Sequence, residues 1–386
     1  MSALVKVAPA AMAAPIRVMV VDDSIVVRGH VRHWIESEPV LELAASLRDG
    51  RDAVDQVLAV NPDVVVLDIE MPGLDGVSAL PLLLEKMPDL AVIIASSLTP
   101  RNAEVTLKAL ALGALDCIAK PDASVADSLA TFRRELMTKV IELGTIRKRR
   151  RGEAVARRPA GNQPASRPAA ARGAAPEIAE DGTIRLRPFP KTMPRVLAIG
   201  ASTGGPQALV HVMSGLAAVS ERAPILITQH MPATFTTILA EHLTRAIGRP
   251  VREAEEGEAV RAGQVYLAPG GRHMRVTRRD GIAVIALDDG APIHHCKPAV
   301  DPLFGSAAQT WGPWVLGVIL TGMGSDGRNG ASDIVGAGGA VIAQDEESSV
   351  VWGMPGAVAQ AGLCSAVLDL DAIAAKVTRL FSGDRA

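Results

Sequence analysis

Three side chains in the C-terminal half of the chain have the chemistry of acyl transfer. Ser202 lies in GASTGGP after the apolar run RVLAI, His230 follows APILITQ, and Asp326 lies in the turn TGMGSDG after another apolar run. Each follows an expected buried strand, and the carboxyl ends of parallel strands share one edge of a sheet. A histidine can take the serine proton while a carboxylate fixes its tautomer. The pattern predicts a serine, histidine and aspartate triad.

The stretch GASTGGP, taken alone, permits two interpretations. Glycines on both sides of Ser202 remove side-chain bulk, and the helix expected after them offers unpaired amides to a developing negative charge. A tight turn or a phosphate cradle would use the same features, although the stretch matches neither GxSxG nor GxxxxGK[ST]. His230 and Asp326 at matching strand ends favour the nucleophile. The glycines of TGMGSDG would also let backbone amides approach an oxyanion.

Five other histidines compete with His230 for the role of base: His211, His242, His273, His294 and His295. The first two fall in helical patterns, which favour packing or surface positions. His273, in LAPGGRHM, is the main rival and could line the pocket. The last two adjoin Cys296, but no fourth ligand has the spacing of a metal site.

A second reactive set ends the apolar runs of the N-terminal half: Asp22, Asp23, Asp68, Ser96 and Lys120. Strands and helices alternate here, which predicts a five-stranded parallel (βα)5 sheet with helices on both faces. Clustered carboxylates need a hard cation such as Mg²⁺, and one of them can then attack phosphorus. Helix capping would explain one aspartate, but not five residues at strand ends.

This set resembles the receiver domain of bacterial two-component response regulators, over about residues 16–135. The resemblance implies that Asp68 is the phosphoacceptor and that Asp22 and Asp23 hold Mg²⁺ together with it. Ser96 and Lys120 would sense the phosphoryl group. The phosphodonor would be a partner histidine kinase.

The C-terminal motifs extend the resemblance to the whole chain: GASTGG, TQHMP, LAPGGRHM, VDPLFGSAA, LTGMGSDG and QDEESSVVWGMPGA. Behind a receiver, they resemble the chemotaxis protein-glutamate methylesterase, or CheB, family. The resemblance implies a doubly wound, mainly parallel α/β catalytic domain without a cofactor in the esterase site. Ser202 would be the nucleophile, His230 the base and Asp326 the orienting carboxylate. The Met323 amide would contribute to the oxyanion hole, and Thr203 would assist near the nucleophile.

The family removes methyl groups from glutamate methyl esters in the cytoplasmic helices of chemotaxis receptors, releasing methanol, and often deamidates selected glutamines. The resemblance implies that the unphosphorylated receiver covers the catalytic cleft and that phosphorylation exposes it. Two other classes stay open, a signalling adaptor without catalysis and a DNA-binding output. The intact triad argues against the first, and the absence of a helix-turn-helix pattern argues against the second.

Length and composition predict two or three globular domains, since the chain has 386 residues and 48% of them are hydrophobic. We expect a tail at 1–15, the receiver at 16–135, a helix end and basic linker at 136–193, and the catalytic domain at 194–386. The linker begins with RKRRR, which would suit a nucleic-acid arm. We favour a mobile, solvated tether, because no reading helix or aromatic platform accompanies it.

Charge and cysteine content point to a soluble, cytoplasmic protein without nucleic-acid binding or membrane insertion. The formal net charge is −2, and no apolar run reaches the roughly 18 residues of a membrane helix. Cys117, Cys296 and Cys364 are far apart and form no CxxC pair, which is typical of a reducing compartment. Two residues depart from the families named above. Cys117 replaces an aromatic switch residue, and Ala299 in KPAVD replaces an expected serine.

Overall fold

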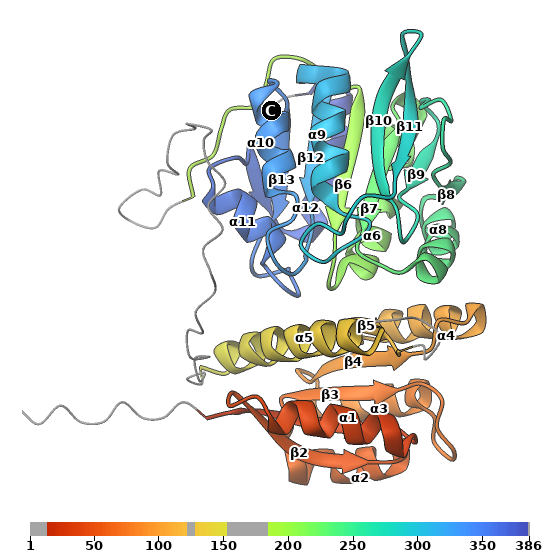
Figure 1. Cartoon of the computed structure of the whole chain (residues 1–386). Coiled ribbons are helices and arrows are strands. Elements are labelled where there is room, and N and C mark those ends of the chain that lie inside the picture. The colour runs from red at the N-terminus through yellow and green to blue at the C-terminus, as the bar shows by residue number, and fades with distance from the viewer. Residues whose placement is uncertain (1–13, 122–127, 153–183, 385–386) are drawn as a thin grey trace, which may run out of the picture. The chain divides into compact units, whose positions relative to one another are not determined.

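The computed structural model describes residues 14–121, 128–152 and 184–384. They form two compact units, each built on one large parallel sheet (Figure 1). Most of the expected N-terminal tail, up to residue 13, lies outside the described residues, and so do residues 153–183 of the expected linker.

The first sheet has the strand order β2-β1-β3-β4-β5, with every pair parallel. Its strands are β1 (Ile16–Val21), β2 (Leu41–Leu47), β3 (Val64–Asp68), β4 (Ala91–Ser96) and β5 (Asp116–Ala119). The helices that alternate with them are α1 (Ile25–Glu36), α2 (Gly50–Val60), α3 (Gly76–Lys86), α4 (Pro100–Ala111) and α5 (Ser128–Arg150). The apolar runs make buried strands because helices cover both faces of such a sheet. The predicted (βα)5 fold is confirmed.

The second sheet has seven strands in the order β14-β13-β12-β6-β7-β9-β8, again all parallel. Its strands are β6 (Val196–Ala201), β7 (Ile225–Gln229), β8 (Val251–Glu253), β9 (Val265–Leu267), β12 (Val315–Ile319), β13 (Ala340–Gln344) and β14 (Ala366–Leu368). The expected hairpin is present as a separate antiparallel pair, β10 (His273–Arg279) and β11 (Ile282–Asp288). The predicted doubly wound α/β fold is therefore confirmed as well.

Helices of the second unit pack on this sheet and on one another (Figure 1). They are α6 (Gly205–Ser214), α7 (Ala217–Arg222), α8 (Ala233–Ile247), α9 (Val300–Trp311), α10 (Arg328–Gly336), α11 (Met354–Gln360) and α12 (Leu370–Phe381), with a short 3-10 turn η1 (Gly312–Trp314). Residues of α9 and α10 share one buried apolar cluster with the β10-β11 hairpin and with β6 and β12. That cluster fixes α9 beside the central strands of the sheet.

The start of the basic run is not a tether, which corrects the expectation for RKRRR. Helix α5 continues to Arg150, and within it Arg147 and Lys148 are only 4% and 2% exposed. Arg147 lies 3.3 Å from the Asp63 carboxylate and 3.2 Å from that of Asp89, and Lys148 lies 3.4 Å from Asp63. From the sequence alone the RKRRR run was expected to be exposed to solvent, because its acidic partners lie far away in the chain. Arg147 and Lys148 are therefore structural parts of the first unit.

No helix in the described parts of the chain combines the length and the apolar character needed to cross a membrane.

Candidate active site

Three adjacent strands carry the residues predicted to form the triad. Ser202 follows β6, His230 follows β7, and Asp326 lies in the turn after β12, while β6 lies between β12 and β7 in the sheet. The chain leaves β6 toward β7 on one side and returns to its other side with β12. This reversal is a topological switch point, where carboxyl-end loops splay apart and leave room for a ligand.

The His230 and Asp326 side chains are in direct contact. The imidazole Nε2 lies 2.7 Å from Asp326 Oδ2, and the two side chains are 8% and 1% exposed. Since a carboxylate only accepts, Nε2 carries the proton and donates it, which leaves Nδ1 for a substrate or a serine. Burial alone would raise the pKa of Asp326, but the histidine and the backbone N–H groups of Val300 and Asp301 lower it below its ordinary value.

Asp326 also caps helix α9. Its carboxylate accepts hydrogen bonds from the backbone N–H groups of Val300 (2.6 Å), Asp301 (3.0 Å) and Gly327 (2.9 Å). Val300 and Asp301 begin α9, and the preceding residue, Ala299, has no side chain able to cap them. First-turn amides need acceptors, and a negative charge there is favoured by the helix dipole. The departure at Ala299 therefore leaves this task to Asp326.

Ser202 lies in a tight connection between strand and helix. Its backbone N–H donates to Thr321 O (3.0 Å), and its carbonyl accepts from Gly205 N–H (2.7 Å). Gly204 has a φ of +73°, a conformation that suits glycine. The Ser202 side chain is partly exposed. Within the described residues the hydroxyl makes no hydrogen bond to His230, so a substrate or a rotamer change would have to complete the pair.

The loop from Thr321 to Asp326 approaches Ser202 closely. A Cβ added at Gly322 would stand 2.8 Å from Ser202 Cβ, so a side chain at residue 322 would not fit. The next residue is Met323, whose N–H has no acceptor within the described part of the chain. Thr203 is buried, and its carbonyl accepts from the Thr321 hydroxyl (2.9 Å). The loop therefore brings a backbone donor near the serine.

His273, the main rival to His230, holds a loop in place. Its Nδ1 accepts from Ala299 N–H (3.1 Å), its Nε2 donates to Ala291 O (3.0 Å), and the residue is 1% exposed. Both ring nitrogens are therefore engaged by backbone. Of the other histidines, His211 contacts Asp371 at 2.8 Å on the surface.

The predicted acidic site of the first unit is also assembled at strand ends. Asp22, Asp23 and Asp68 place one carboxylate oxygen each within 4.8 Å of the others, the only such group of three in the described residues. Lys120 lies 2.8 Å from Asp22 and 2.7 Å from Asp68. Burial raises the pKa of Asp68 to about 6, although Lys120 opposes the rise. Clustered hard oxygen donors of this kind suit Mg²⁺.

Two other predicted residues of this unit have local partners. The Ser96 hydroxyl donates to Ser97 O at 3.3 Å. Cys117 is buried in β5, where burial raises its pKa to about 12, and its carbonyl accepts from Lys139 Nζ (2.8 Å). An inert thiol thus occupies the position at which an aromatic switch residue was expected.

The chain has relatives with the same two domains. The model of the CheB methylesterase family matches residues 197–377, and that of the response regulator receiver domain matches residues 18–127. A protein-glutamate methylesterase/protein-glutamine glutaminase of Rhodopseudomonas palustris strain BisB5 is 58% identical over 372 residues, 96% of this chain and 95% of the relative. The chain belongs to this enzyme family.

A second relative gives the same assignment, and one solved domain is also similar. A methylesterase of the same name, from a group 2 operon of Bradyrhizobium diazoefficiens, is 57% identical over 97% of this chain and 96% of the relative. The crystal structure of the Thermotoga maritima CheB methylesterase catalytic domain is 39% identical, with a TM-score of 0.47, and covers 49% of this chain and all of that domain. The protein is a hydrolase of the chemotaxis methylesterase family that carries a receiver domain.

Cys296 is a neighbour of His230 that the sequence analysis missed. Two backbone hydrogen bonds close a turn at Ile293–Cys296: Ile293 N–H donates to Cys296 O (3.1 Å), and Cys296 N–H donates to Ile293 O (2.8 Å). The Cys296 thiol interacts with the His230 imidazole. Sequence reasoning considered Cys296 only as a metal ligand. Its position directly before Lys297, whose peptide bond to Pro298 is cis, gave no signal of this contact.

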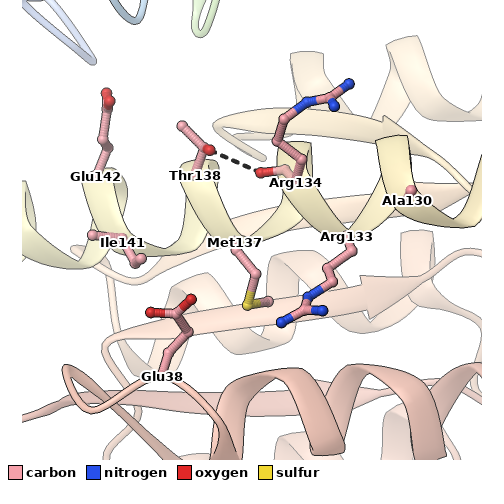
Figure 2. A pocket seen from close by; sticks show the side chains of 8 residues that line it. All are labelled: Glu38, Ala130, Arg133, Arg134, Met137, Thr138, Ile141 and Glu142. Atoms are coloured by element: carbon pink, nitrogen blue, oxygen red, sulfur yellow. Dashed lines mark hydrogen bonds between the residues drawn. The ribbon is translucent and has the colours of Figure 1, made fainter. Parts of the chain in front are cut away.

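The first unit also has a pocket of about 530 Å³ (Figure 2). Its lining residues come from α5 and the turn after α1: Glu38, Ala130, Arg133, Arg134, Met137, Thr138, Ile141 and Glu142. The Thr138 hydroxyl donates to Arg134 O, so it is engaged within the helix. Burial raises the pKa of Glu142 to about 7. None of the predicted site residues lines this pocket, and we assign it no function.

The contact with Cys296 predicts the titration of His230. Burial alone would lower the pKa of the imidazole, but Cys296 and Asp326 raise it above the ordinary value of about 6.5. Replacing Cys296 with alanine should move the midpoint of His230 to lower pH, as measured by NMR of the histidine ring. The matched variant Cys364→Ala, at a buried cysteine elsewhere in the unit, should leave it unchanged. An unchanged midpoint in Cys296→Ala would refute the contact.

Proposed function

We propose that the protein is a phosphorylation-activated esterase acting on glutamate methyl esters in the cytoplasmic domains of chemotaxis receptors, with release of methanol. The same site would deamidate selected glutamines, and the output would be sensory adaptation. One observation carries the proposal: His230 contacts the buried Asp326 at 2.7 Å, beside the strand that delivers Ser202. An adaptor without catalysis would not need a buried histidine–carboxylate hydrogen bond at this edge of the sheet.

The geometry supports a two-step acyl transfer. Ser202 Oγ attacks the ester carbonyl while His230 Nδ1 takes its proton, and Asp326 stabilises the imidazolium through Nε2. The Met323 N–H would donate to the tetrahedral oxyanion, with Thr203 supporting the turn. The imidazolium then protonates the leaving methoxide. Water, activated by the same imidazole, hydrolyses the acyl-serine and frees the glutamate carboxylate.

The receiver would regulate this chemistry through Asp68. We propose that Asp68 accepts a phosphoryl group from a partner histidine kinase and that Asp22, Asp23 and Asp68 hold Mg²⁺. The ion would neutralise charge on the transferring phosphoryl group. Lys120 already contacts two of these carboxylates and would turn to the phosphoryl oxygens, with Ser96 as a second sensor. Phosphorylation would relieve inhibition of the esterase by the receiver.

Replacing Ser202 with alanine tests the nucleophile. Methanol release from a methylated receptor should fall by a factor on the order of 10⁶, because triad nucleophiles act as a unit with their base. Thermal unfolding should change little, since the backbone of Ser202, not its hydroxyl, makes the contacts that hold the turn. Undiminished methanol release would reject the assignment.

Replacing Asp68 with alanine tests the regulation. Methanol release by the parent protein should increase when a small phosphodonor and Mg²⁺ are added, and this increase should be absent in Asp68→Ala. The variant should still release methanol without the phosphodonor, because the substitution lies in the other unit. Equal stimulation of parent and variant would contradict the role of Asp68.

The acidic cluster predicts a pH-dependent affinity for Mg²⁺. Because the pKa of Asp68 is about 6, protons should compete with the ion. The dissociation constant measured by titration calorimetry should rise about fourfold from pH 7.5 to pH 5.5. Asp23→Ala should bind more weakly at both pH values, since it loses a ligand but keeps Asp68. A dissociation constant independent of pH in the parent protein would mean that Asp68 is not a ligand.

A further inference from the structure

Gln229 connects the backbones of the two reacting residues. It ends β7, directly before His230, and is 2% exposed. Its side-chain Nε2 donates to Ser202 O at 2.8 Å and to His230 O at 3.3 Å. One buried amide group therefore spans from the turn that carries the serine to the residue that carries the imidazole.

The orientation of this amide is set by chemistry. Both of its neighbours on one side are carbonyl oxygens, which only accept, so the NH₂ group must face them. The Gln229 Oε1 atom is buried and has no hydrogen-bond partner among the described residues. It fills the space beside Gly205, where an added Cβ would stand 2.1 Å away. An unpaired buried acceptor is unfavourable, and the chain tolerates it at this position.

The Ser202 peptide is held from the opposite side as well. Its N–H donates to the carbonyl oxygen of Thr321 at 3.0 Å, two residues after β12 ends and ahead of the turn with Asp326. Gln229 comes from β7, the neighbour of β6 on its other side. The serine backbone is therefore fixed by the same two strands that lead to the histidine and the aspartate.

We propose that Gln229 is a positioning residue for the esterase, which keeps Ser202 at a fixed distance from His230. The inference rests on the proposed function, in which these two residues are nucleophile and base. Gln229 is buried and reaches the reaction only through backbone carbonyls. Its loss should lower kcat and leave KM unchanged, because a misplacement of about 1 Å can cost about 10²-fold in rate.

Gln229→Leu removes the donors at nearly constant volume. We expect kcat for methanol release to fall by about 10- to 100-fold with KM unchanged. The rate at which a fluorophosphonate labels Ser202 should fall in parallel. Thr228→Val is the matched control, since the neighbouring Thr228 hydroxyl is buried and also has no partner in the described part of the chain. That variant should keep the parent kcat. A Gln229→Leu enzyme within twofold of the parent in both assays would overturn the proposal.

Gln229→Glu is a second test variant, which can be used if the leucine variant fails to fold. It measures the pH dependence of kcat, which a residue that only stabilises the fold would not change. A protonated glutamic acid can donate to Ser202 O, whereas an ionised one repels it. The ratio of variant to parent kcat should therefore fall as pH rises. A constant ratio, with lowered or unchanged activity, would contradict positioning through the Ser202 carbonyl.

The outcomes also separate this inference from the proposed function. A fully active Ser202→Ala enzyme would refute the proposed function. An inactive Ser202→Ala enzyme together with a fully active Gln229→Leu enzyme would refute only the role of Gln229.

Discussion

The carboxylate of Asp326 is the group on which the catalytic unit depends. It is 1% exposed and receives four N–H donors, three from backbone and one from His230. A buried charge is tolerated only when it is paired and hydrogen-bonded in this way. The arrangement links the start of α9, the turn after β12 and the imidazole through a single side chain. Substitution of Asp326 would therefore disturb the helix cap and the histidine together.

Both units place their chemistry by the same topological rule. In the first sheet β1 lies between β2 and β3, and Asp22 and Asp68 come from the carboxyl ends of β1 and β3. In the second sheet β6 lies between β12 and β7, and Ser202 follows β6. Each site is thus at a point where the chain reverses its direction of winding. The edge of one sheet collects three carboxylates, and that of the other collects a hydroxyl, an imidazole and a carboxylate.

The sequence predicted the parts of the sites that follow from strand ends. Buried parallel strands are continuous apolar runs, so the residues that follow them can be read directly, and Ser202, His230 and Asp326 were proposed in this way. Contacts made by long-range packing were not predictable. Cys296 reaches His230 from a loop 66 positions later, and Gln229 is a polar residue with no periodic signal.

Burial of charged residues was the other limit. The run RKRRR has the composition of a tether, yet Arg147 and Lys148 are buried against Asp63, more than 80 positions earlier. Local composition predicts solvation only when no distant partner neutralises the charge. The role of Ala299 was also unclear from the sequence, because the side chain that caps α9 is that of Asp326, 27 positions later in the chain.

The central claim is that Ser202 is acylated during turnover, with His230 as the base and Asp326 as the carboxylate that orients it. Rapid quenching of the full-length protein with a receptor peptide carrying a glutamate methyl ester, followed by peptide mass spectrometry, tests it most directly. The account predicts a transient glutamyl adduct on the peptide that contains Ser202, formed together with one equivalent of methanol. Methanol release with no adduct, or with the adduct on Cys296, would contradict it.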